Sequence, residues 1–298
     1  MAHARDPQWR ATFGFDVFQI DQSLVASEPP NQITYLRGRF DQHEVTAALK
    51  KSGYQHVDIE GIGAYSLFPE AGIDLHSPVS QLAFTRMNNA VFLHDGTLAF
   101  SPTLDVIRQV VAVSNGEAPS LASRVDIPAV VQAIPDRLAS AILILGHTLS
   151  LSSGLIDPRL SAEQAGVLMA QIQQTGEMPP ISLALLGVSP GGPLPPPLSG
   201  TPEPSPVAEV SRLAVFEIGL LTLTPDRART AEQVVTARVQ ALSSSVSQRP
   251  YRDMFTRVKS VGPADQPIAV VQLTFGDAVS PRLWTQLLFR RDLLFLGW

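Results

Sequence analysis

Residues 33–53, ITYLRGRFDQHEVTAALKKSG, contain a complete strand-to-helix unit. Residues 33–40 are rich in β-branched and aromatic side chains and follow a Pro-Pro-Asn turn, which predicts a strand. Asp41 lies where a helix N-cap belongs, and Glu44 follows at the capping-box position. Gly53 ends the predicted helix, because glycine accepts the left-handed conformation that closes helices. The stretch therefore predicts a strand, a helix and both helix boundaries.

Other stretches repeat this order of strand, cap and helix. Thr224 and Ser280 each precede a proline, which is favoured at the first helical position because its missing N–H costs nothing there. Ser101 precedes a proline in the same way, and Ser161 with Gln164 matches a capping box. The predicted helices are 21–27, 42–52, 103–114, 127–134, 161–175, 226–242 and 282–290.

Residues 90–100 predict a β-hairpin. Asp95-Gly96 is a favoured two-residue turn between two apolar runs. A two-residue turn would place Leu93 opposite Leu98 and thereby fix the register of the remaining pairs.

The proline-rich residues 189–206 predict an extended connector, because they carry almost no apolar side chains for a core. They would separate an N-terminal domain, 1–188, from a C-terminal domain, 207–298. The C-terminal domain has the element order βαββαβ of ferredoxin-like folds, with its last strand near 293–296. The N-terminal domain repeats this theme with insertions. The predicted fold class is α+β, with antiparallel or mixed sheets and helices on one face.

Composition and charge exclude several classes of function. A net charge of -5 and a pI of about 5.7 disfavour nucleic acid as a partner, since phosphates call for a basic face. The chain has no cysteine, which excludes disulfides, thiolate catalysis and cysteine-ligated metals. The N-terminus lacks the apolar core of a signal peptide. Residues 138–156 approach the length of a membrane span, but polar residues interrupt them, and 142–145 predict a buried strand instead.

Two glycine-containing motifs fail in their context. Residues 187–191 match the G-x-S-x-G nucleophile elbow around Ser189, but the prolines that follow prevent the required helix, and no histidine lies beyond His147. Residues 61–63, Gly-Ile-Gly, lack the third glycine of a dinucleotide-binding loop. They predict a bulge or bend within 54–68, which forms one long strand or two short ones.

Polar side chains elsewhere do not converge on a site. Side chains with metal-ligand or acid–base chemistry occur at His56, Asp58, Glu60, Asp74, His76 and His94. No spacing connects them, and turn, loop or exposed strand positions explain each one. The sequence therefore predicts no catalytic residue, no cofactor and no metal.

The apolar run 284–298, WTQLLFRRDLLFLGW, has two interpretations. It supplies the last helix and strand of a core, as the βαββαβ order requires. Alternatively it forms an exposed docking patch, because aromatic residues and arginine are favoured at interfaces.

Several stretches resemble a group of uncharacterised bacterial exported proteins, many of them lipoproteins. The resemblance lies in YLRGRFDQHEVTAALKKSGY at 35–54, GIGAYSLF at 61–68, AVFLHDGTLAFSP at 90–102 and APSLASR at 118–124. It implies an extracytoplasmic or cell-surface location and supplies no catalytic residues. A cytoplasmic location is the alternative, because signal and lipobox cysteine are absent.

The sequence favours a non-enzymatic interaction or assembly module, as a subunit of a larger complex with another protein chain as partner. A carrier of an apolar small molecule or lipid is the alternative, and a hydrolase is a third interpretation. A membrane would be contacted only through an N-terminal anchor that has been removed.

Overall fold

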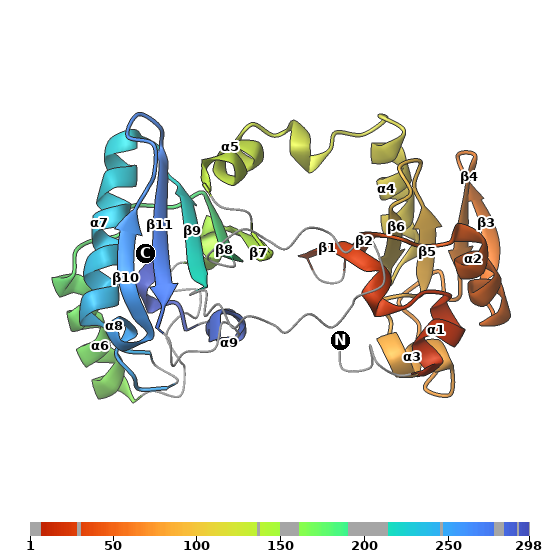
Figure 1. Ribbon diagram of the computed structural model, residues 1–298, viewed down its shortest axis with the longest axis horizontal. Helices are drawn as coiled ribbons and strands as arrows, with labels where there is room; N and C mark the ends of the chain where they lie inside the picture. The colour runs from red at the N-terminus through yellow and green to blue at the C-terminus, as the bar shows by residue number, and fades with distance from the viewer. Residues whose placement is uncertain are drawn as a thin grey trace, which may run out of the picture. The chain divides into compact units, whose positions relative to one another are not determined.

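The computed structural model divides the chain into two compact units, Met1–Ser120 and Leu121–Trp298, drawn in red to yellow and in green to blue in Figure 1. The structure describes residues 7–28, 31–135, 138–149, 161–189, 214–244, 247–276, 283–290 and 292–297.

The first unit is built on a 6-stranded antiparallel sheet with the order β1-β2-β6-β5-β4-β3. Its strands are β1 Ile20–Glu28, β2 Asn31–Gly38, β3 Gln55–Ile59, β4 Ile62–Ser66, β5 Asn89–Phe92 and β6 Leu98–Ser101. Its helices are α1 Pro7–Phe13, α2 Gln42–Lys51, α3 Pro78–Ala83 and α4 Leu104–Ser114, and it has a short 3-10 turn at Val17–Gln19. A further 3-10 turn, Leu121–Ser123, begins the second unit.

Helices cover both faces of this sheet. Phe92, Leu98 and Phe100 pack in one cluster with side chains of α1, α2 and α3, whereas Val91 and Ala99 pack in a second cluster with α4. Neighbouring residues of a strand point to opposite faces, so the two clusters lie on opposite sides. The predicted α+β class with antiparallel sheets is confirmed. Helices cover both faces and not one as expected, because β5 and β6 are buried along their whole length and need cover on both sides.

The predicted boundaries of α2 are confirmed. The Asp41 side chain accepts hydrogen bonds from the backbone N–H groups of His43 (2.8 Å) and Glu44 (3.1 Å). These bonds lower the pKa of Asp41, the bond from Glu44 having the larger effect. Gly53 has a φ of 95°, as the closing residue of a helix requires.

The predicted register of the 90–100 hairpin is wrong by one residue. Phe92, and not Leu93, lies opposite Leu98. The Leu93 carbonyl accepts from the Gly96 N–H (3.0 Å), and the Leu93 N–H donates to the Thr97 carbonyl (2.9 Å). The loop therefore has three residues and ends at a glycine with a φ of 79°, a turn that pairs with a bulge.

Two further expectations for this unit are corrected, and an alternative left open is decided. Residues 21–27, predicted as a helix, belong to strand β1, where they pair with β2. Of the two alternatives for 54–68, two short strands are confirmed, because β3 and β4 form a hairpin whose turn lies at Glu60 and Gly61, both with positive φ. Ser101 does not cap α4, because it ends β6 and its hydroxyl donates to the Gln32 carbonyl.

The second unit is built on a 5-stranded antiparallel sheet with the order β10-β11-β9-β8-β7. Its strands are β7 Ser140–Leu145, β8 Leu183–Ser189, β9 Val215–Leu221, β10 Phe255–Ser260 and β11 Ile268–Phe275. Its helices are α5 Asp126–Ala133, α6 Ala162–Gln174, α7 Pro225–Ala241, α8 Tyr251–Met254 and α9 Leu283–Phe289, with 3-10 turns η3 Gly146–Leu149 and η5 Leu294–Leu296.

Two predicted helix starts in this unit are confirmed. Thr224 caps α7 by accepting from the Arg227 N–H, with Pro225 as the first helical residue. Ser161 and Gln164 form both hydrogen bonds of a capping box on α6. Ser280, the third predicted cap, lies outside the described residues.

The five-stranded sheet departs from the predicted domain boundary. The predicted boundary after residue 188 places β7 and β8 in the N-terminal domain, but β8 pairs with β9 over its whole length. The compact units divide between Ser120 and Leu121. Strand β8 is buried over its whole length and is a central strand, with β7 on one edge and β9 on the other. The predicted connector, 189–206, lies outside the described residues apart from Ser189.

The predicted final strand is absent from this part of the fold. Residues 294–296 form the 3-10 turn η5, and β8 occupies the position beside β9 that the last strand of a ferredoxin-like fold would take. The split βαβ order of β9, α7 and β10 around β11 is present as predicted.

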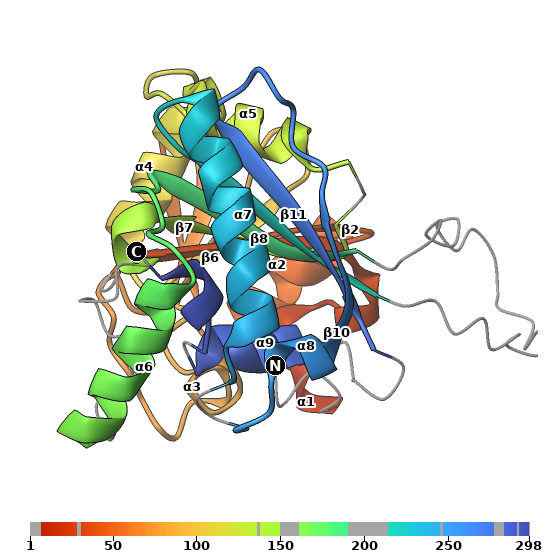
Figure 2. The same ribbon diagram turned by 90° about the vertical axis from the view of Figure 1, so that its left-hand side faces the viewer.

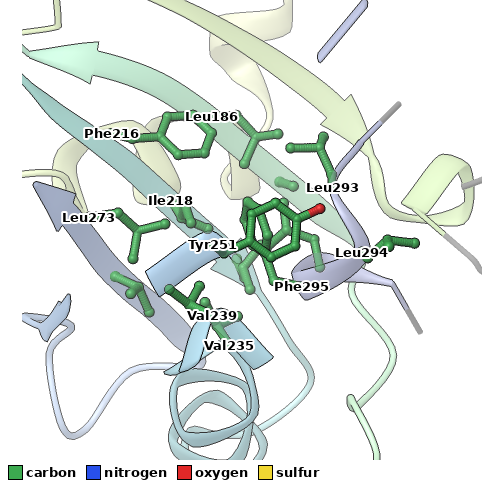
Figure 3. Close-up of a cluster of buried hydrophobic side chains, with 14 of the residues drawn as sticks. Leu186, Phe216, Ile218, Val235, Val239, Tyr251, Leu273, Leu293, Leu294 and Phe295 are labelled. Carbon is green, nitrogen blue, oxygen red and sulfur yellow. The ribbon is translucent and has the colours of Figure 1, made fainter. Parts of the chain in front are cut away.

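Helices also cover both faces of the five-stranded sheet. Figure 2 looks onto the face that α7 and α6 cover, and Figure 3 shows the core there, where Val235 and Val239 of α7 meet Ile218 and Leu273 of the strands. On the opposite face, Val130 and Ile134 pack with Leu185 and Val270. Helix α5 approaches closely over Gly219, where a Cβ atom would lie 3.2 Å from Ile134 and Val130.

Candidate functional site

The surroundings of Ser189, the serine of the G-x-S-x-G motif, indicate a structural role. It is buried at the end of β8, and its hydroxyl donates to Oε1 of the buried Glu217 (3.1 Å). Gln272 Nε2 donates to the same oxygen (3.1 Å). The second unit has one histidine, His147, which follows the opposite end of the β7–β8 pair, about 20 Å away along the strand. Among the described residues no histidine lies beside this serine, and its carboxylate partner Glu217 is buried with it.

The candidate metal ligands and acid–base groups lie at separate exposed positions. Asp74 accepts from the His76 N–H (2.9 Å) within a loop, and His94 lies in the β5–β6 turn. His56 packs edge-on against Tyr65 on the β3–β4 hairpin. Within the described ranges, no group of three His, Asp or Glu side chains is placed to hold a metal ion.

Asp58 and Glu60 serve the β3–β4 turn. Asp58 Oδ1 accepts from the Gly61 N–H (3.3 Å), and Glu60 adopts a φ of 53°. The Asp58 hydrogen bond and the Glu60 backbone conformation are explained by the turn and do not indicate a common ligand.

Arg238 is a buried cation that sequence reasoning missed. It lies on α7 with 2% of its surface exposed, and it donates to Thr175 Oγ1 (3.2 Å) and to the carbonyls of Gly176 (3.0 Å) and Gly297. Thr175 and Gly176 end α6, so the guanidinium occupies the negative end of that helix dipole. Burial lowers the pKa of Arg238 to about 10, which keeps it charged at neutral pH.

A second buried polar cluster holds the segment after α9. The Tyr251 hydroxyl donates to Asp292 Oδ1 (2.9 Å), and the Ser244 hydroxyl donates to Asp292 Oδ2. Burial raises the pKa of Tyr251 well above its usual range, and the neighbouring Asp292 adds to that shift. Both buried clusters tie segments of one unit together.

The apolar run 284–298 packs into the core over its described part. Leu287, Leu293 and Phe295 are buried, and Phe295 contacts Tyr251 edge-on at 4.9 Å between ring centroids, as seen in Figure 3. The packing interpretation of this run is therefore confirmed there. The side chains of Trp284 and Trp298 lie outside the description.

A shallow hollow of about 420 Å³ lies beside α7 and β10. Its lining residues are Arg229, Glu232, Gln233, Thr236, Ala237 and Ser260. Arg229 bonds to the Ala264 carbonyl, and Glu232 Oε1 accepts from the Val270 N–H (3.1 Å). These side chains are engaged by the protein's own backbone, so the hollow offers no converging catalytic groups.

Strand β7, with the sequence SAILIL, exposes apolar side chains at the edge of the five-stranded sheet (Figure 1). Ile142, Leu143 and Leu145 are exposed by 42%, 40% and 50%. The strand predicted at 142–145 is confirmed, but its predicted burial is wrong. An unbroken apolar run does not distinguish a central strand from an edge strand, so no signal in the sequence could have revealed the exposure.

The backbone of β7 also faces outward at alternate residues. The Gly146 N–H donates to the Ser182 carbonyl (3.0 Å), and Ile144 lies opposite Ala184 and Ile142 opposite Leu186. Hydrogen-bonded pairs alternate in an antiparallel ladder, so Ile142 and Ile144 bond to β8. Ala141, Leu143 and Leu145 consequently direct their N–H and C=O groups away from the sheet, where no described strand pairs with them. Of these groups, the Leu145 carbonyl accepts from Thr148 Oγ1 (2.7 Å).

The three other sheet edges carry features that discourage pairing with another strand. Strand β10 has a register irregularity and exposes Arg257 and Lys259. Strand β1 has a similar irregularity at its start, where Asp21 Oδ1 lies 3.8 Å from Arg39 Nε, although it exposes Leu24 and Val25 further along. Strand β3 exposes Asp58. Charges and bulges are the usual protection of edge strands. Strand β7 has neither a charge nor a register irregularity between Ser140 and Leu145.

Comparison with known proteins gives no relative. No known protein family, no curated protein and no solved structure matches this chain. Among the helices of the described ranges, none is long and apolar enough to cross a membrane.

Proposed function

We propose that this chain is a non-enzymatic interaction or assembly module, a subunit that binds another protein chain through strand β7. The observation that carries the proposal is the exposed apolar edge of β7, where Leu143 and Leu145 accompany outward-facing backbone groups. Addition of a strand to a free sheet edge is a common mode of recognition, in which main-chain hydrogen bonds supply affinity and side chains supply specificity.

The placement of the polar residues supports a role without catalysis. Ser189, Arg238 and Asp292 form hydrogen bonds within the second unit, and the candidate histidines His56, His76 and His94 lie at separate exposed positions of the first. A catalytic site requires a nucleophile, a base and an orienting group that converge on one reacting atom. An extracytoplasmic location is part of the proposal and rests on the resemblance of residues 35–124 to exported proteins.

No specific observation in the described residues favours the alternative, a carrier of an apolar small molecule. The hollow beside α7 is lined by charged or polar side chains apart from Ala237. Apolar ligands are bound in enclosed sites lined mainly by hydrophobic and aromatic side chains.

A photo-reactive amino acid at position 145, with a matched one at Thr256 on β10, tests the proposal in cells that make the protein. Both positions are exposed and lie on opposite edges of one sheet. We expect covalent adducts of discrete protein mass at position 145 and none at 256. Equal labelling at the two positions, or no protein adduct at 145, would contradict the proposal.

A further inference from the structure

We infer that the partner strand at β7 is the β7 strand of a second copy of this chain, so that two five-stranded sheets join into one continuous antiparallel sheet. The inference rests on the proposed function and names the partner. Three properties of β7 support it: the backbone N–H and C=O groups that face outward, the absence of charged side chains, and the length of the strand.

The alternation of backbone groups limits the possible registers, and pairing all three outward residues selects one. Ala141, Leu143 and Leu145 face outward, and in an antiparallel pair outward-facing residues must form the hydrogen-bonded pairs. A two-fold axis through Leu143 places Leu143 opposite Leu143 of the second copy and Ala141 opposite Leu145 of the second copy, so all three residues form hydrogen-bonded pairs. The Leu145 carbonyl, which accepts from Thr148 Oγ1 (2.7 Å), would accept a second hydrogen bond from Ala141 of the second copy.

Charge favours a second copy as the occupant of this edge. The chain has a net charge of -5, yet residues 138–156 contain no Asp, Glu, Lys or Arg. Two β7 strands therefore meet without placing like charges opposite one another. Pairing β10 with β10 of a second copy would instead bring the exposed Arg257 and Lys259 against their own kind, which is destabilising.

The length of β7 sets the strength of the association. Its 6 residues a copy are far fewer than the roughly 20 to 30 residues a side of a standard interface. We therefore expect a reversible dimer with a dissociation constant in the micromolar range, and not an obligate one.

Sedimentation equilibrium at about 1 to 200 µM protein, a range that brackets a micromolar dissociation constant, tests the inference with five samples. The wild-type chain should convert from monomer to dimer across this range. Leu143→Glu and Leu143→Lys should each weaken association at least about tenfold, because the two-fold axis places like charges opposite each other. Mixing the two variants should restore dimers, since glutamate then faces lysine. Thr256→Glu, on the opposite edge, should dimerise like the wild type.

The outcomes separate this inference from the proposed function. A wild-type chain that stays monomeric throughout overturns self-pairing, and adducts to a different protein at position 145 would still support an interaction module. A dimer that Leu143→Glu leaves intact shows association through another surface and also overturns the inference. Failure of the mixed variants to dimerise, with each variant unfolding at the wild-type temperature, contradicts the register centred on Leu143.

Discussion

The interior of the second unit and its β7 edge reverse the usual placement of polar and apolar groups. Inside, Arg238 and Asp292 are 2% exposed and bond to the unit's own atoms. At the edge, Leu143 and Leu145 are exposed by 40% and 50%. Burying a charge is costly unless hydrogen bonds compensate it, and exposing apolar side chains is costly unless a partner covers them.

The two regions therefore contribute differently to stability and to association. The interior groups hold α6, α7 and the segment 292–297 together, so their removal should lower stability and leave the association of folded chains unchanged. The edge contributes little to the fold of one unit, so its alteration should change association and leave stability almost unchanged. Each prediction below tests one side of this contrast.

Arg238→Ala should give the largest loss of stability, about 3 kcal/mol or more, because hydrogen bonds from a charged donor to three acceptors are lost in a buried site. Urea unfolding followed by circular dichroism measures the loss. Arg238→Lys should not restore stability, since a single ammonium does not reproduce the planar guanidinium. Arg227→Ala, an exposed position on the same helix, serves as the matched control. Equal effects at Arg238 and Arg227 would disprove the interior role.

Tyr251→Phe should cost less, about 1 to 2 kcal/mol, because it removes the hydroxyl that donates to the buried Asp292 and keeps the ring that packs on Phe295. Tyr35→Phe, at a half-buried tyrosine of the first unit, is the control and should change the free energy of unfolding little. If Tyr251→Phe is neutral in urea unfolding, the Tyr251–Asp292 contact does not hold the segment after α9.

Local signals in the sequence predicted the fold best. Asp41, Thr224 and Ser161 were recognised as helix caps because a cap depends on residues within one turn of the chain. The hairpin register failed by one residue, because Asp95-Gly96 is compatible with both a two-residue and a three-residue loop.

Properties set by distant segments were not predictable. The final strand expected at 293–296 became a 3-10 turn, since β8 from earlier in the chain takes the place beside β9. The order of strands in a sheet depends on which segments, including distant ones, pair most favourably with each strand. The local sequence pattern of one strand does not contain that information. For the same reason the sequence predicts the strand at β7 but not its exposure.

Residue-resolved hydrogen exchange at low and high protein concentration tests the central claim most directly. The amides of Ile142 and Ile144 bond to β8, so they should exchange slowly at both concentrations. The amides of Ala141, Leu143 and Leu145 should exchange rapidly in dilute protein and at least about tenfold more slowly once most chains are dimeric. Exchange at these three amides that is independent of protein concentration would contradict the account.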